Sequence, residues 1–190
     1  MRTRDQAKYE RVVKAAISMV NELGFAGISI SKIAKQASVS PATIYIYFEN
    51  KEDLFSKLYR DIRNEMSQVA LQGLQADMTI EQEFKSIWNN FFAFSLEHPQ
   101  YLAYRERFEQ TAMMKKISGN EFELFHHIGD LFHRGIKESE IKDLPLPVLI
   151  SFAFIPIITL LKFHFEGTIV MDERQINEAS EIAWSAVERY

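Results

Sequence analysis

Cysteine is absent from this 190-residue sequence. Its absence excludes disulfides, thiolate zinc sites and cysteine nucleophiles, and it suits a reducing cytoplasm. The first residues, MRTRDQAKYE, lack the apolar segment of a secretion signal, so a cytoplasmic location is expected. A chain of this length can bury roughly 70% of its unfolded surface, so a core can form without covalent cross-links.

The sequence also lacks the motifs of common enzymes. It contains no Gly-rich phosphate loop, no HExxH and no GxSxG, and nothing pairs its serines with its histidines. Neither a catalytic role nor a cofactor is therefore expected. The longest uncharged run, LPLPVLISFAFIPIITLL at 144–161, is shorter than the ~20 apolar residues of a spanning helix. Because it contains three prolines, a buried core or subunit-interface helix is favoured over a membrane span.

Positive charge is concentrated near the beginning of the chain. Residues 1–60 carry ten Lys and Arg against six Asp and Glu, a net charge of +4. The remaining residues carry twelve against twenty, a net charge of −8. A basic head on an acidic body indicates an anionic partner for the head, although an excess of four charges is a weak signal by itself.

Apolar residues recur at helical spacing almost throughout, which predicts an all-α protein of about nine helices. Ser29, Ser40 and Asn50 are candidate N-caps, and Pro41 suits a first helical position. Capping boxes are predicted at Thr79 with Gln82 and at Asp172 with Gln175. A sixth helix is expected from about 100 to 116, and Pro156 should kink the helix at 146–165. The predicted domains are a helix-turn-helix head, 1–49, and a helical-bundle body, 50–190.

The two short helices within SKIAKQASVSPATIYIYFENKEDL, residues 31–54, are joined by about three residues. Such a pair is typical of a helix-turn-helix, whose second helix lies in the DNA major groove. At 100° per residue, Ile44 and Phe48 share the buried face, while Ala42, Thr43 and Ile46 point away from it. Small and apolar residues at the front suit close approach to base edges and thymine methyl groups. The alternative is that the tyrosines are half-buried core and that Ile46 is an exposed residue without a role.

The stretch GFAGISISKIAKQASVSPATIYIYFENKEDLF, residues 24–55, resembles the DNA-binding region of the TetR family of bacterial transcriptional repressors. The matching features are a Gly-aromatic pair, a Ser cap, Ile-Ala, a Val-Ser turn, Thr-hydrophobic-Tyr-x-Tyr-Phe and x-Lys-x-x-Leu. The match covers roughly thirty residues, and the rest agrees in general layout. The resemblance implies a homodimer that binds a palindromic operator and is released by a small effector held in the body.

Carried over by position, the resemblance implies a set of residues that contact double-stranded DNA. It places in the groove Ser40, Pro41, Ala42, Thr43, Tyr45 and Ile46, and on phosphates Tyr47 and Lys51. Because residues 41–48 contain no Arg or Lys, guanine contacts would come from Lys32, Lys35, Arg2 or Arg4. We therefore hypothesise an operator rich in A·T contacts at the centre of each half-site.

The sequence departs from the family at two positions. Ser38 stands where the turn often has Gly, so we expect the turn to form without a residue free to adopt the left-handed conformation. Ile46 stands where many members have a polar residue or His.

The body contains many aromatic residues, which suit an apolar pocket for a lipophilic effector or an ordinary core. The preferred pocket candidates are Trp88, Tyr104, Phe108 and Phe125. The resemblance also implies that the last two helices form a four-helix bundle across a homodimer, with an intra-chain core as the alternative. The candidate interface residues are Phe152, Ile155, Thr159, Phe163, Ala179, Ala183 and Val187.

Four residues at helical spacing, Glu123, His126, His127 and Asp130, have ligand types that metals accept. Such a run is more often a solvated face or a core histidine, so no metal is expected. The favoured function is a ligand-responsive repressor without a membrane association. Two alternatives stay open: a DNA-binding protein of this fold that has no effector, and a helical carrier or interaction protein.

Overall fold

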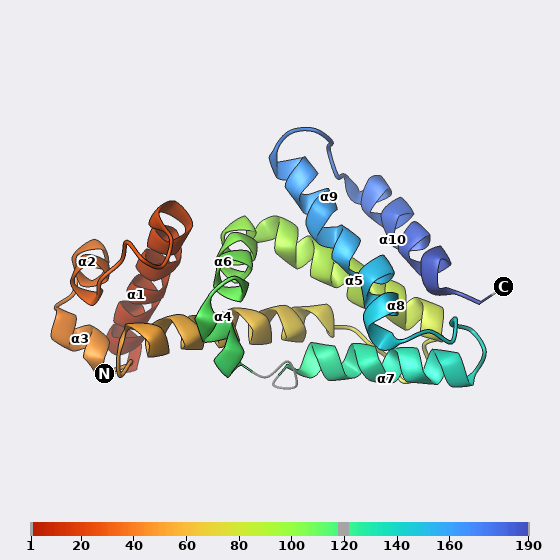
Figure 1. Ribbon diagram of the computed structural model, residues 1–190, viewed down its shortest axis with the longest axis horizontal. Helices are drawn as coiled ribbons and strands as arrows, with labels where there is room; N and C mark the ends of the chain where they lie inside the picture. Colours follow the sequence, from red (N-terminus) through yellow and green to blue (C-terminus); the bar gives the residue numbers. More distant parts are fainter. Residues whose placement is uncertain (1, 118–121, 190) are drawn as a thin grey trace. The chain divides into compact units, whose positions relative to one another are not determined.

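The computed structural model describes residues 2–117 and 122–189, and in the first turn, residues 2–4, it describes the backbone alone. Over this part of the chain the protein is all-helical, with one isolated bridge between Ile141 and Glu188 (Figure 1). The ten α-helices and one 3-10 helix are α1 Arg2–Leu23, α2 Ile30–Gln36, α3 Pro41–Tyr45, α4 Lys51–Ala70, α5 Ile80–Glu97, α6 Pro99–Glu109, η1 Ala112–Lys116, α7 Glu123–Lys137, α8 Leu146–Ala153, α9 Ile155–Phe165 and α10 Glu173–Val187.

The predicted helix starts are confirmed by their capping hydrogen bonds. Ser29 accepts from the N–H of the third residue of α2, and Ser40 does the same for α3, where Pro41 takes the first position. Asn50 Oδ1 accepts from Asp53 N–H at 2.9 Å. Both predicted capping boxes, at the starts of α5 and α10, are present. Each bond satisfies an N–H that the helix leaves without a partner.

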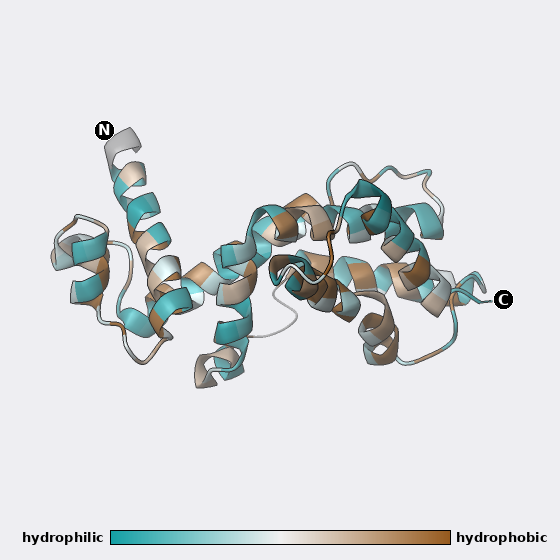
Figure 2. Cartoon of the chain, turned by 90° about the horizontal axis from the view of Figure 1, so that it is seen from above, coloured by the Kyte–Doolittle hydropathy of each residue, from teal (hydrophilic) through white to brown (hydrophobic). Residues whose placement is uncertain are grey.

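The described residues fall into two compact units. The first comprises Met1–Arg63 and His98–Ser118, and the second comprises Asn64–Glu97 and Gly119–Tyr190. This division differs from the boundary expected after residue 49, because the first half of α4 and all of α6 pack with the N-terminal helices. Figure 2 shows apolar and polar residues alternating along the helices, as expected for helices that each bury one face.

The core of the first unit joins α1 to α2 and α6. Val12, Ala16 and Val20 of α1 have no exposed surface, and neither has Ile33 of α2. The core continues into an aromatic cluster, in which the Tyr59 and Phe108 rings stack at 4.4 Å and Phe25 meets Phe55 edge-on at 4.9 Å. This packing fixes α1, on which the short helices α2 and α3 rest.

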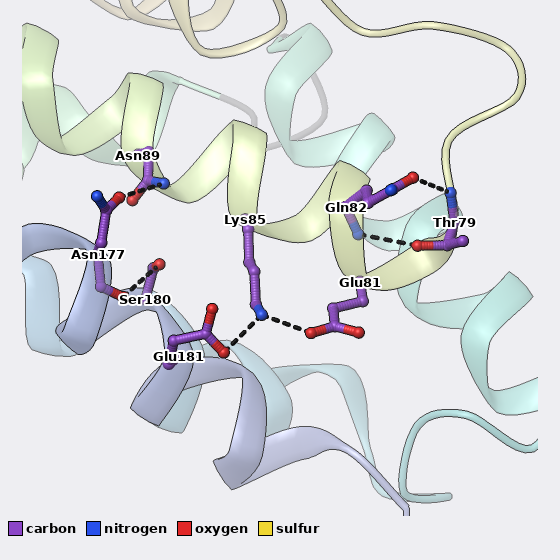
Figure 3. Close-up of polar contacts among 8 residues, drawn as sticks. All are labelled: Thr79, Glu81, Gln82, Lys85, Asn89, Asn177, Ser180 and Glu181. Atoms are coloured by element: carbon purple, nitrogen blue, oxygen red, sulfur yellow. Dashed lines mark hydrogen bonds and ion pairs between the residues drawn. The ribbon is translucent and has the colours of Figure 1, made fainter.

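The second unit is organised around α5, whose buried residues include Phe84 and Trp88. The Phe84 ring lies 5.3 Å from the rings of both Phe154 and Trp184, and Trp88 Nε1 donates to Ala153 O at 2.9 Å. Figure 3 shows the polar edge between α5 and α10, where Lys85 bridges Glu81 and Glu181. Burial acts to lower the pKa of Lys85, but these carboxylates outweigh it and the pKa is raised.

Two helices differ from the sequence prediction. The sixth ends at Glu109 instead of continuing to residue 116, because both the hydroxyl and the N–H of Thr111 donate to Phe108 O, at 2.7 and 2.9 Å. A threonine that bonds a carbonyl of the preceding turn competes with the helix. The helix expected at 146–165 is interrupted at Phe154, since Pro156 has no N–H to donate to the residue four positions earlier.

The segment formed by α8 and α9, Leu146–Phe165, is long and apolar enough to cross a membrane by length and composition. Only 28% of its most apolar window is buried within the chain. Phe152 and Ile155 are 63% and 55% exposed. An exposed apolar surface of this kind is typical of an interaction site.

Candidate nucleic-acid interface

The turn between α2 and α3 is held by a left-handed serine. Ser38 has φ +54°, and its N–H donates to Lys35 O at 3.2 Å. The expectation that this turn forms without a left-handed residue is therefore wrong, because serine itself adopts that conformation. Arg11 of α1 donates from Nε to Ala37 O at 3.1 Å and holds the turn from outside. Arg11 was not predicted from the sequence, since no local pattern connects positions 26 residues apart.

The two faces of the helix that follows have opposite environments, as the helical wheel predicts. Ile44 and Phe48 are 0% and 2% exposed, whereas Ile46 and Tyr45 are 75% and 56% exposed. Ala42 and Pro41 are also exposed, and Thr43 is half-buried. The buried pair fixes the helix on the core, so its outer face is presented rigidly.

The hydroxyl groups at the start of this helix are already hydrogen-bonded. Ser40 Oγ accepts from Thr43 N at 3.3 Å and lies 3.0 Å from Thr43 Oγ1. Tyr47 Oη donates to Asp5 O at 3.1 Å, and its ring meets Tyr9 edge-on at 5.4 Å. These contacts connect the predicted DNA-binding helix to the first turns of α1.

Two of the predicted DNA ligands, the phosphate candidate Lys51 and the guanine candidate Lys32, bond to backbone carbonyls of the loop before α2. Lys51 is half-buried, and its ammonium donates to Ile28 O at 3.1 Å and to Phe25 O at 3.5 Å. Lys32 is exposed, and its ammonium donates to Gly27 O at 2.8 Å. An ammonium has three N–H donors, so each lysine keeps at least one for a DNA acceptor. The candidates Arg2 and Arg4 lie in the first turn of α1, with side chains outside the described part.

Lys57 is a further cation at this surface, which the sequence analysis did not select. Its Nζ lies 3.0 Å from Asp53 Oδ2, donates to Tyr47 O at 3.3 Å and sits over the Phe48 ring. Burial acts to raise the pKa of Asp53, but the N–H of Glu49 and the charge of Lys57 outweigh it and lower that pKa. Lys57 therefore supports the end of the helix from the next helix along.

The four effector candidates fall in two different units. Tyr104 and Phe108 are fully buried in the first unit, where Tyr104 Oη donates to Phe55 O at 2.9 Å. In the second unit Trp88 is fully buried and Phe125 is 38% exposed. Trp88 also forms the floor of an apolar groove between α9 and α10.

This groove has a volume of about 380 Å³ and contains four of the predicted interface residues. It is lined by Trp88, Phe152, Pro156, Thr159, Leu160, Ala179, Ile182, Ala183 and Ala186. Of the other three candidates, Ile155 and Phe163 are exposed, whereas Val187 is 1% exposed because its side of α10 packs inside its own chain. Ile182, at 72% exposure, is the large apolar residue of α10 that the sequence analysis missed.

Of the four residues in the histidine run on α7, His127 contacts a buried carboxylate of α5. His127 Nε2 lies 2.7 Å from Glu83 Oε1, and Arg134 bonds both oxygens of the same buried carboxylate, at 2.8 and 2.7 Å. Within residues 2–117 and 122–189, no group of three or more His, Cys, Asp or Glu is placed to hold a metal.

Comparison with known proteins agrees with this arrangement. Residues 12–58 match the model of the bacterial regulatory proteins of the tetR family, and residues 79–188 match that of the tetracyclin repressor-like C-terminal domain. A TetR family transcription regulator from Marinobacter aquaeolei VT8 is 30% identical over 100% of both chains, with a TM-score of 0.92.

Two similar proteins are named for fatty acid metabolism or degradation. The fatty acid metabolism regulator protein of Bacillus subtilis (strain 168) is 25% identical over 139 residues, 72% of each protein. The fatty acid degradation regulator of Bacillus halodurans has the same fold, with 21% identity, a TM-score of 0.73 and 94% and 93% coverage. Both proteins are named as regulators. The chain has both parts of such a regulator and belongs to the TetR family of helix-turn-helix transcriptional regulators.

Proposed function

We propose that this protein is a cytoplasmic, ligand-responsive repressor that binds a palindromic operator as a homodimer and is released by a small lipophilic effector. The observation that carries the proposal is the outer face of α3. Ile44 is completely buried and anchors the helix, while Ile46 and Tyr45 are exposed and make its outer face largely apolar. The small side chain of the exposed Ala42 leaves room for close approach to DNA. Such a surface is better suited to contact with the bases of a major groove than to exposure to solvent.

The contacts with DNA follow from the positions of the side chains. Ile46 and the Thr43 methyl group would meet thymine methyl groups, and Ser40, Pro41, Ala42 and Tyr45 would line the groove. Tyr47 and Lys51 would contact phosphates, which set the register of the helix on the duplex, and Lys32 would contact guanine. Since α3 has no Arg or Lys, we expect half-sites with A·T pairs at their centre.

The apolar surface of α8, α9 and α10 supports the homodimer. Phe152, Ile155, Thr159 and Phe163 present one continuous exposed stripe, with Ala179, Ala183 and Ile182 across the groove. A second copy of the same surface would cover both stripes around a twofold axis. Val187 would support this surface from inside its own chain.

Release by a lipophilic effector is supported by the aromatic interior and by the relative named for fatty acid metabolism. Tyr104 and Phe108 remain proposed lining residues within the first unit, and Trp88 and Phe125 remain proposed lining residues within the second unit. An effector-independent DNA-binding protein of the same fold is the alternative.

The test is selection of operators from random duplexes by the full chain, followed by affinity measurements at two salt concentrations. We expect a palindromic site whose affinity falls steeply with salt, because phosphate contacts release counterions. A salt-dependent affinity without an enriched sequence would replace the repressor with a non-specific chromosome-binding protein. Absence of binding would favour a helical carrier or interaction protein.

A further inference from the structure

A groove with a volume of about 620 Å³ lies between α1 and the start of α6, within the first unit. On α1 it extends from Gln6 to Glu22, roughly 24 Å of helix at 1.5 Å per residue, and on α6 it is bordered by Gln100 and Tyr101. A cavity of this volume can hold a small organic molecule. Its lining includes none of the four residues proposed to contact the lipophilic effector.

The middle of this α1–α6 groove is apolar. Val13 and Ile17 line it from successive turns of α1, and Ile17 is 3% exposed. Tyr9, one turn before Val13, and Tyr101 of α6 add two half-buried rings. Aliphatic and aromatic side chains suit an apolar ligand, and the faces of tyrosine rings also attract cations.

Asn21 provides an unsatisfied acceptor at one end of the groove. Its Nδ2 donates to Gln100 O at 2.9 Å, whereas its Oδ1 is buried and accepts no hydrogen bond from the described residues. A buried carbonyl oxygen without a donor is destabilising. A ligand N–H group at this end of the groove would supply the missing donor.

The same end of the groove carries negative charge. Glu22 follows Asn21 and is exposed, and its carboxylate accepts from Ser18 Oγ at 2.8 Å. Lys14 is the one cation among the described lining residues. It lies about one turn from Glu10, whose charge it offsets, but about two turns from Glu22. The charge of Glu22 therefore favours a cationic group in the occupant.

We propose that the α1–α6 groove binds an amphipathic amine, a molecule with an apolar body and a protonated amino group. The body would lie along Val13 and Ile17, and the ammonium would lie among Asn21 Oδ1, the Glu22 carboxylate and the Tyr101 ring. An ammonium has three N–H donors, so one group can serve both oxygens.

The groove shares a side chain with the support of the predicted DNA-binding helix. The Tyr9 ring meets Tyr47 edge-on at 5.4 Å and stacks on Phe48 at 5.8 Å, and its hydroxyl donates to Asp61 Oδ2 at 2.9 Å. An occupant that contacts Tyr9 would therefore touch a residue that holds the segment directly after α3. Such a site goes beyond the proposed function, because it lies in the unit that carries α3 and is separate from the proposed effector lining.

Three matched probes test the charge requirement: 4-phenylbutylamine, 4-phenylbutan-1-ol and 4-phenylbutyrate. Methyl NMR of the full chain without DNA would follow Val13 and Ile17, with the buried Ile157 of the second unit as the reference. We expect the amine to shift the Val13 and Ile17 signals and to bind roughly threefold more tightly than the alcohol and about tenfold more tightly than the carboxylate. Equal affinities, no binding of the amine, or shifts confined to the second unit would overturn the proposal.

Charge reversal tests the position of the ammonium. Glu22→Lys should invert the order, so that 4-phenylbutyrate binds more tightly than 4-phenylbutylamine. Glu106→Lys is the matched control, because Glu106 is also an exposed glutamate of the first unit but does not line the groove. Both side chains are exposed, so both variants should keep the stability of the original protein.

An unchanged order in Glu22→Lys, or an inverted order in Glu106→Lys, would contradict the proposal, because the charge requirement would then lie outside the groove. The measurements require no DNA. Failure to bind an amine is therefore separate from failure to bind an operator, which would count against the proposed function alone.

Discussion

Ile46→Ala should weaken operator binding without weakening the fold. Ile46 is 75% exposed, so removing its outer carbons changes little buried surface, and the free energy of unfolding should change by less than ~0.5 kcal/mol. On DNA the same carbons would contact thymine methyl groups. At ~0.8 kcal/mol per buried methylene, their loss should cost about 1–2 kcal/mol per half-site, or roughly 5- to 30-fold in affinity.

Ile44→Ala is the matched control, because Ile44 lies two residues earlier on the same helix and has no exposed surface. It should destabilise the protein by about 2–5 kcal/mol through the cavity that it creates. Fluorescence anisotropy with the selected operator and urea unfolding would give both quantities for both variants. The slope of affinity against salt should not change in Ile46→Ala, since no charge is lost. An Ile46→Ala protein with undiminished affinity, or one as unstable as Ile44→Ala, would refute the assignment of this face.

Three further predictions concern the fold around the two surfaces. Lys51→Met should reduce the free energy of unfolding by about 1–2 kcal/mol, because two carbonyls lose a charged donor, and unchanged stability in urea titration would leave phosphate binding as its only role. Gly135→Ala should destabilise the protein by about 1–3 kcal/mol, since the new methyl group would overlap Ile141 Cδ1. Gly129→Ala should stabilise it by up to ~1 kcal/mol, because the new methyl group would lie 3.7 Å from Leu146 Cδ2, an ordinary contact distance. Thermal unfolding that ranks the two variants in the opposite order would contradict this packing. Burial, together with the charge of Glu109, raises the pKa of Tyr59 to about 12 from 10.0, so the folded state favours the neutral phenol. The contribution of Tyr59 to the free energy of unfolding should therefore be complete below pH 10 and should decrease between pH 10 and 12. In urea denaturation measured at each pH, Tyr59→Phe should reduce that decrease.

Features that depend on neighbours in the sequence could be predicted before the structure. The caps at Ser29, Ser40 and Asp172 join residues three positions apart, so the sequence contains both partners side by side. The faces of α3 follow from the same local geometry, which is why the burial of Ile44 and the exposure of Ile46 were both expected.

Contacts between distant residues could not be predicted in this way. The ammonium of Lys51 reaches carbonyls 23 and 26 residues earlier, and Arg11 reaches a carbonyl 26 residues later. Nothing in the spacing of charged residues identifies such partners. Helical periodicity likewise defines the faces of α10 but not which of them α5 covers, and for that reason Val187 was assigned to the wrong side and Ile182 was missed.

The internal contacts of Lys32, Tyr47 and Lys51 bear on how strongly the head can bind DNA. Each side chain donates a hydrogen bond to a backbone carbonyl of its own unit, at 2.8, 3.1 and 3.1 Å. Ordering a free side chain at an interface costs roughly 0.5–1.5 kcal/mol, and these three are already ordered. They keep their charge or their hydroxyl acceptor, so counterion release and phosphate contact would remain possible. We therefore expect an affinity that depends on preorganised phosphate contacts at the edges of each half-site and on apolar contacts of α3 at its centre.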